Sequence, residues 1–192
     1  MKLAARYLPY LLLAAIMLTL ALLPDPVQQL LQYQRSRLAQ GEWWRLISGQ
    51  LLHSNYWHLL MNLAGLMLAM LLHGNYWRWQ SLLQQWLSSA LLISLALYFF
   101  SPQIGIYVGL SGLLHAMLTL GALKDIQLKL TTGWLLLAGL VLKVGFEQWH
   151  GPDQALAELI DASVATDAHL YGVASGLLLA LLWLVAALRR QH

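Results

Sequence analysis

Three clusters of polar residues interrupt the long apolar segments of this chain, and their residue types could together carry out hydrolysis. The clusters are His53-x4-His58-x3-Asn62, Gly109-Leu110-Ser111-Gly112 and His169-x2-Gly172-x3-Gly176. They supply a hydroxyl as a candidate nucleophile, an imidazole as a candidate base, and amide or imidazole groups as hydrogen-bond donors. Because polar and ionisable groups are costly inside a bilayer, their presence in apolar segments suggests a functional site within the membrane.

The segments that carry these clusters are long enough to be membrane-spanning helices, which need roughly 20 mostly apolar residues. Six segments are candidates: 7–23, 51–73, 82–100, 107–123, 131–147 and 168–188. They fill most of the chain and leave no room for a sizeable soluble appendage. We therefore expect an all-α membrane protein, a bundle of six transmembrane helices that forms a single domain over residues 1–192.

The composition excludes several other classes of protein. Hydrophobic residues make up 59% of the chain and charged residues only 10%, whereas a soluble domain usually carries about 25% charged residues. The net charge of +3 is small, so nucleic-acid binding has no basic patch to rest on. Cysteine is absent, which excludes thiolate nucleophiles and cysteine metal sites. The histidines form no His-Glu-x-x-His pattern, and we expect neither a metal nor a cofactor.

Basic residues indicate how the six segments are oriented. If the segments alternate, one side receives Lys2, Arg6, Arg78, Lys124, Lys129, Arg189 and Arg190. The other side receives Arg35, Arg37 and Arg45, with Lys143 near a helix end. The positive-inside rule then places both termini in the cytoplasm. Segment 24–50 is expected to lie in the outer interface, and the acidic segment 147–167 to lie outside.

This orientation brings the polar clusters to one depth. The second, fourth and sixth segments all run from outside to inside, so His58, Asn62, Ser111 and His169 lie in the first turns of their helices. His58 and Asn62 are four residues apart and share one helix face. Three separate segments thus place reactive side chains in the outer half of the membrane.

The three clusters, in this order, resemble the signatures of the rhomboid family of intramembrane serine proteases. That family has His-x4-His-x3-Asn in its second core helix, Gly-x-Ser-Gly in the fourth and His-x2-Gly-x3-Gly in the sixth. Trp44-Arg45 resembles the Trp-Arg pair of the family's first loop, and the resemblance covers nearly the whole chain. The small size, the absence of a cytoplasmic domain and the run Leu-Ser-Gly-Leu-Leu-His at 110–115 further resemble rhombosortase, a bacterial branch of the family.

The resemblance implies a catalytic dyad without an acid, with Ser111 as nucleophile and His169 as general base. A serine hydroxyl needs such a base, because it is a poor nucleophile until a neighbour accepts its proton. His58, Asn62 and the backbone amide of Ser111 would donate to the oxyanion, and one such donor is typically worth about 3–4 kcal/mol.

Four glycines are expected to support this site. Gly109 and Gly112 allow backbone and substrate to approach closely beside the nucleophile. Gly172 and Gly176 form a small-xxx-small face on the sixth segment. That face would let the fourth and sixth helices pack tightly, which the dyad requires.

Several of these residues have other interpretations. His115 lies four residues after Ser111, and helix side chains lean toward the N-terminus, so spacing alone would let it act as the base. We assign the base to His169 and expect His115 to be a packing or hydrogen-bonding partner beneath it. Asp167 could orient His169, but a solvated loop acid is the preferred interpretation. His53 is expected to tie the helix to the outer loop.

The same polar residues have simpler explanations. Ser111 alone would be a helix-packing serine, and His58 with Asn62 would be an interhelical hydrogen-bond pair. Only the combination of these residues indicates a catalytic site instead of these structural roles.

The predicted function is hydrolysis of a peptide bond in a membrane-anchored protein, near the outer face of the bilayer. The bacterial branch places the chain in the inner membrane with the site on the periplasmic side, and transmembrane proteins are its substrates. One alternative is an inactive rhomboid-like protein that binds or escorts membrane proteins, against which the Ser111/His169 pair argues. A small transporter is a third class, but the inner half of the helices holds few polar residues.

Segment 147–167 contains Gly151-Pro152, five acids and an expected short helix at 154–160. We predict that it is a mobile cap over the outer mouth of the site, with the fifth segment admitting the substrate laterally. The rhombosortase resemblance implies a substrate with a C-terminal anchor, made of a glycine-rich stretch, one transmembrane helix and a basic tail.

Overall fold

The computed structural model describes residues 2–189, and six long helices account for most of them. The helices are α1 (Lys2–Ala21), α5 (Tyr56–His73), α6 (Trp79–Phe100), α7 (Ser111–Gln127), α8 (Thr131–His150) and α10 (Thr166–Arg189). Each predicted apolar segment corresponds to one of them, so the prediction of a mostly helical fold is confirmed. Met1 and residues 190–192, which include Arg190 of the predicted basic end, lie outside the described residues.

Three of the helices, α5, α6 and α10, are long and apolar enough to cross a membrane by length and composition. Their outward surfaces carry large exposed apolar side chains, such as Leu71, Leu91 and Leu181. Contiguous exposed apolar surface of this kind is rare in soluble monomers. The number of six spans and the orientation of the termini remain predictions.

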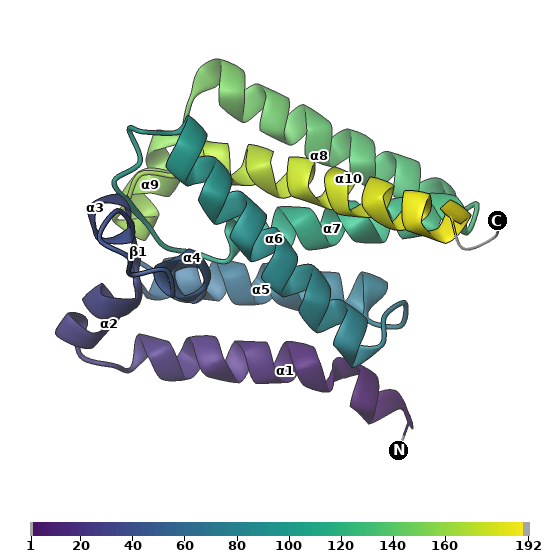
Figure 1. The fold of residues 1–192 in the computed structure, drawn as a ribbon, viewed down its shortest axis with the longest axis horizontal. Helices are drawn as coiled ribbons and strands as arrows, with labels where there is room; N and C mark the ends of the chain where they lie inside the picture. Colours follow the sequence, from purple (N-terminus) through teal and green to yellow (C-terminus); the bar gives the residue numbers. More distant parts are fainter. Residues whose placement is uncertain (1, 190–192) are drawn as a thin grey trace.

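The short elements gather at one end of the bundle (Figure 1). They are α2 (Asp25–Leu31), β1 (Tyr33–Gln34), α3 (Arg35–Leu38), α4 (Arg45–Ser48), the 3-10 turn η1 (Gly49–Leu51), β2 (Ile106–Tyr107) and α9 (Gln154–Ile160). The start of α1 and the end of α10 lie at the opposite end (Figure 1). The predicted helix at 154–160 is confirmed as α9.

Two helices start later than the sequence predicts. The second apolar segment was expected to begin at residue 51, but α5 begins at Tyr56, because the Asn55 side chain caps it by accepting from the His58 backbone N–H. The fourth was expected from residue 107, but Tyr107 belongs to β2, which pairs antiparallel with β1. Gly109 then has φ +123°, a backbone conformation that residues other than glycine rarely adopt. Ser111 is therefore the first residue of α7.

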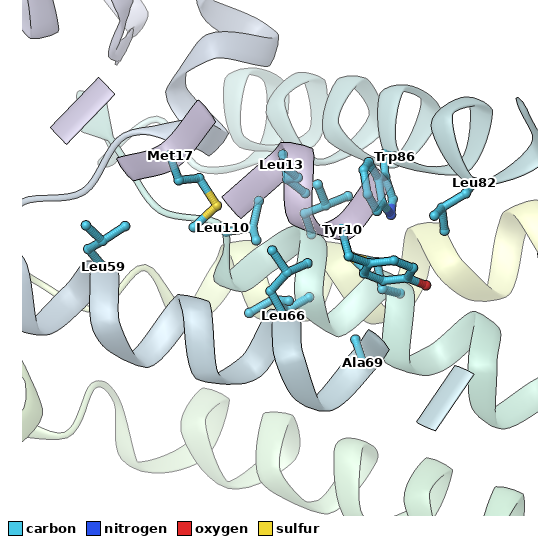
Figure 2. Packing of buried hydrophobic residues seen from close by; sticks show 12 residues of the cluster. Tyr10, Leu13, Met17, Leu59, Leu66, Ala69, Leu82, Trp86 and Leu110 are labelled. Atoms are coloured by element: carbon cyan, nitrogen blue, oxygen red, sulfur yellow. The ribbon is translucent and has the colours of Figure 1, made fainter. Parts of the chain in front are cut away.

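Helix α7 forms the centre of the bundle and packs most extensively against α10. On its other side, buried apolar side chains of α1, α5 and α6 converge on it (Figure 2). Tyr10 of α1 meets Trp86 of α6 edge to face, with ring centroids 5.4 Å apart. Nearby, Met17 and Leu13 of α1 belong to the same cluster as Leu66 of α5 (Figure 2). This packing holds α5 and α7 side by side.

Arg45 organises the loop between α1 and α5. Its side chain is only 2% exposed, and it pairs with Glu42 at 2.6 Å. The same guanidinium donates to the backbone carbonyls of Gln29 and Gln32, at 2.7 and 2.8 Å. A guanidinium offers five donors in a fixed plane, so one side chain holds the C-terminal end of α2 against the start of α4. Trp44 is exposed and donates to a carbonyl of α2.

Candidate active site

Ser111 and His169 meet at the end of the bundle where the short elements lie. The Ser111 Oγ atom is 2.9 Å from His169 Nε2, across 58 residues of sequence. Ser111 opens α7, and His169 lies in the first turn of α10. His169 is 5% exposed, so bulk water has little access to its imidazole, and Nε2 contacts the serine hydroxyl. The arrangement would let the imidazole accept the hydroxyl proton.

Glycines allow α7 and α10 to approach this closely. A Cβ added to Gly172 would stand 2.9 Å from the His115 Cβ and would also overlap the Gly112 carbonyl oxygen. A Cβ on Gly176 would stand 2.8 Å from the Thr119 Cβ. Neither distance is tolerable between carbon atoms, so the interface has no room for a side chain at either position. The contact between Ser111 and His169 depends on this spacing.

His115 lies beneath His169 and is bound differently. The two imidazole rings stack, with centroids 4.3 Å apart and planes inclined by 19°. The Nδ1 atom of His115 is 2.7 Å from the carbonyl oxygen of Ser111. A carbonyl only accepts, so Nδ1 carries a proton and donates it. The closest polar contact of His115 is therefore with the backbone of Ser111, whereas the hydroxyl faces His169.

His58 and Asn62 of α5 face the strand-to-helix turn before Ser111. A Cβ on Gly109 would stand 2.6 Å from His58 Nε2 and 3.7 Å from Asn62 Nδ2, so the backbone here lies against both side chains. Asn62 Nδ2 donates one proton to the His58 carbonyl at 3.2 Å, and its amide has a second. Because Ser111 begins α7, its own N–H has no acceptor within the helix.

Ser54 links His58 to α9 and determines which nitrogen of the imidazole can donate. The Ser54 hydroxyl is 2.6 Å from the Ile160 carbonyl oxygen and 3.0 Å from His58 Nδ1. If its single proton goes to the carbonyl, Nδ1 must be the donor and Nε2 the acceptor. The Ser54 backbone N–H, 3.4 Å from Nδ1, favours the opposite tautomer. Donation from Nε2 to an oxyanion requires that second arrangement.

Glu147 is a site residue that the sequence-based interpretation missed. Its Oε2 atom is 2.8 Å from His169 Nδ1, and its Oε1 atom is 2.6 Å from Lys143 Nζ. The sequence predicts that Glu147 belongs to the acidic outer segment, whereas α8 continues to His150 and turns Glu147 toward His169. The available signal was the spacing of Lys143 and Glu147, four residues apart at the end of an apolar segment.

Two other residues considered for the site lie beside it. The Asp167 carboxylate accepts from Ser101 Oγ at 2.6 Å and Gln103 Nε2 at 2.8 Å, and so points toward the loop after α6. His53 precedes α5, and its ring meets the His58 ring edge to face at 5.0 Å. Among the described residues, neither ring nitrogen of His53 has a hydrogen-bond partner. Its predicted tie to the outer loop remains a prediction.

A cavity of about 410 Å³ leads to Ser111 from the end of the bundle where α2 and α9 lie. Its walls include Gln28, His53, Ser54, His58, Val164 and Ser111 itself. The loop after α9 forms one wall, while Ser54 and Asn55 hold the end of α9 through its Ile160 and Leu159 carbonyls. Within residues 2–189 no group of three or more histidine, aspartate or glutamate side chains could hold a metal ion.

The family model of the rhomboid domain matches residues 40–186, and the chain therefore belongs to the rhomboid family. Members of this family are generally intramembrane serine proteases that act on transmembrane substrates within the bilayer. Together with the apolar helices, this membership indicates an integral membrane protein. No curated protein matches the chain.

Proposed function

We propose that this protein is an intramembrane serine endopeptidase with Ser111 as its nucleophile and His169 as its general base. The observation that carries the proposal is the 2.9 Å contact between Ser111 Oγ and His169 Nε2. It joins a hydroxyl and a buried imidazole from two helices in a chain of the rhomboid family. The hydroxyl proton then has an acceptor at the place where a substrate would be attacked.

The reaction follows from this geometry in two halves. His169 Nε2 takes the proton as Ser111 Oγ attacks the scissile carbonyl carbon, and the protonated imidazole then gives it to the leaving amine. The acyl group stays on Ser111 as an ester. A water molecule, deprotonated by His169, attacks the ester, and the returning proton restores the serine hydroxyl. The products are a new amino terminus and a new carboxylate, as hydrolysis requires.

Negative charge on the tetrahedral intermediate would meet donors from two helices. The N–H of Ser111 and the free amide proton of Asn62 are available without rearrangement. His58 joins them once Nε2 carries the imidazole proton, which follows when the Ser54 hydroxyl turns from Ile160 to His58 Nδ1. Displacement of α9 by a substrate would release that hydroxyl.

The substrate must enter as an unwound segment, because the backbone of a helix in lipid is protected by its own hydrogen bonds. The rhombosortase resemblance suggests a C-terminal anchor whose glycine-rich stretch unwinds easily. In this proposal both termini are cytoplasmic, the membrane is the bacterial inner membrane, and the site faces the periplasm. Replacing the glycines of a tagged substrate with leucine should slow initial cleavage. Equally fast cleavage, or cleavage of an unanchored peptide, would contradict this substrate class.

The test of the proposed function uses purified protein in lipid vesicles with a panel of tagged single-span substrates. Wild type should cleave a substrate and take up a fluorophosphonate probe at Ser111. Ser111→Ala should remove both, while Ser81→Ala, at an exposed serine of α6, should change neither. Cleavage that survives in Ser111→Ala would overturn the proposal. Substrate binding by wild type without cleavage or labelling would favour the inactive escort protein.

A further inference from the structure

Three side chains are connected across the site by two successive hydrogen-bond contacts. Glu147 Oε2 is 2.8 Å from His169 Nδ1, and His169 Nε2 is 2.9 Å from Ser111 Oγ. The carboxylate comes from α8, the imidazole from α10 and the hydroxyl from α7. The rhomboid resemblance implies a serine and a histidine alone, so the carboxylate is an addition that this chain makes.

A carboxylate in this position has two consequences for the imidazole. It only accepts, so it holds the Nδ1 proton and leaves the Nε2 lone pair directed at the serine hydroxyl. It also carries the charge that stabilises the imidazolium once the serine proton has moved. In serine proteases that use a Ser-His-Asp triad, loss of such a partner's charge costs about 10⁴ in kcat, largely because the wrong tautomer forms.

Glu147 is held in position from the far side. Lys143 lies one turn earlier on α8 and binds Oε1 at 2.6 Å, which leaves Oε2 for the imidazole. The Glu147 side chain is 16% exposed, whereas that of Lys143 is 49% exposed. Because α8 packs against both α7 and α10, Glu147 lies beside His169, and its two oxygens are each bound by a separate partner.

The charged and titratable groups around His169 come from four helices. Glu147 contacts it from α8 with Lys143 bound to the far oxygen of Glu147, His115 stacks on it from α7, and His58 lies across the site on α5. The nearest acid on its own helix, Asp167, is bound by Ser101 and Gln103. Glu147 is thus the carboxylate that contacts the imidazole.

We infer that Glu147 is a positioning residue for the general base, holding His169 in the reactive tautomer and stabilising it when it is protonated. The inference rests on the proposed function and gives this rhomboid a Ser-His-Glu arrangement. A merely structural ion pair would tie α8 to α10 and leave the chemistry of the base unchanged.

The test compares three variants of the full chain in vesicles, using the substrate that wild type cleaves. Glu147→Gln keeps the shape and removes the charge, Glu147→Ala removes both, and Lys143→Met removes only the outer partner. Both Glu147 variants should lose at least about tenfold in kcat, with KM little changed, since the loss appears only as the proton moves. Lys143→Met should lose less kcat than either Glu147 variant, because Glu147 then loses only its outer partner and keeps its contact with His169.

The pH profile separates positioning from packing. A nearby negative charge favours the protonated imidazole, so its removal should move the acid limb of the kcat profile to lower pH in both Glu147 variants. A packing role would lower kcat in Glu147→Ala, would be rescued by Glu147→Gln, and would leave the acid limb in place. That result, or wild-type kcat in both variants, would overturn the inference about Glu147 but would leave the proposed function standing. Wild type that neither cleaves nor labels at Ser111 would overturn the proposed function, and the inference with it.

Discussion

The imidazoles of His169 and His115 both contact Ser111, but they have different hydrogen-bond partners, and the difference assigns them different tasks. His169 offers Nε2 to the hydroxyl and holds a carboxylate on Nδ1. His115 donates from Nδ1 to the Ser111 carbonyl and presents its ring face to His169. A base must reach the proton it removes, at about 2.6–3.2 Å between heavy atoms. Of these two imidazoles, only His169 reaches the hydroxyl within that distance.

Replacing each imidazole should therefore have unequal effects. His169→Ala should lower kcat by about 10²–10⁴-fold, the usual worth of a positioned general base, and should abolish probe labelling at Ser111. His115→Phe keeps the stacked ring, and stacked aromatic pairs are worth about 0.5–1.5 kcal/mol, so a measurable fraction of both signals should remain. Cleavage rate and labelling rate are the measurements. An active His169→Ala beside an inactive His115→Phe would move the base to α7.

The candidate oxyanion donors can be tested in the same assay. Asn62→Ala and His58→Ala should each lower kcat by about 10²–10³, with a smaller effect on KM, because the donors act on charge that exists only in the transition state. Asn75→Ala is the matched control, since Asn75 is exposed on the α5–α6 turn. A variant that lost substrate binding but kept its maximal rate would not be an oxyanion donor.

At the level of elements, the distance between α7 and α10 decides whether the site exists. The two helices touch backbone to backbone at Gly112 and Gly172, and His169 lies one turn before Gly172. α8 closes the third side and brings Glu147. If a substrate entered laterally by pushing α8 outward, Glu147 would separate from His169. Substrate entry would then be coupled to the tautomer of the His169 imidazole.

A methyl group at this interface should force the helices apart. Gly172→Ala should cost about 1–3 kcal/mol, the usual penalty for overpacking, and should reduce activity by more than its loss of folded protein explains. Gly145→Ala is the matched control, because a Cβ there meets nothing within 4 Å and alanine favours a helix. Thermal midpoints in detergent and cleavage rates in vesicles provide the comparison. Equal behaviour of the two variants would contradict the tight interface.

At the level of the whole molecule, a second polar cluster ties the bundle together at the end away from the site. Asp125 of α7 is 6% exposed and accepts from Tyr76 Oη at 2.5 Å and Thr132 Oγ1 at 3.3 Å. His73 Nε2 lies 3.6 Å from the same carboxylate. One side chain thus connects the end of α5, the α5–α6 turn and the start of α8.

Asp125→Asn should therefore destabilise the fold and leave the reaction alone. A buried hydrogen-bonded group that loses its partner costs about 1–3 kcal/mol, which should appear as a lower thermal midpoint, while kcat of the folded fraction stays unchanged. The hydrogen bond to Asp125 raises the pKa of the Tyr76 hydroxyl to about 12. A raised pKa means the contribution is present below the unfolded value and lost as pH rises through 12, so it is constant across the assay range. A fall in kcat would mean that the two ends are coupled.

The spacing of polar residues in the sequence was enough to predict the family, the helical fold and the residues that gather at the site. His58 and Asn62 share a face because they are four residues apart on one helix, and the glycines of the sixth segment recur at the same interval. Such relations lie within a single helix, where the spacing of two residues in the sequence determines whether their side chains share a face. The family match over residues 40–186 confirms the family, while the catalytic roles await the experiments above.

Relations between helices were decided only by the tertiary structure. Glu147 was assigned to the outer segment, because nothing in a one-dimensional pattern says which neighbour the last turn of α8 faces. The β1–β2 pairing, which sets Gly109 and the start of α7, joins residues far apart in sequence that show no strand periodicity. The proton arrangement on His58 depends on Ser54 and on a carbonyl of α9. Each of these features depends on a contact between separate elements, and the packing of the whole bundle determines it.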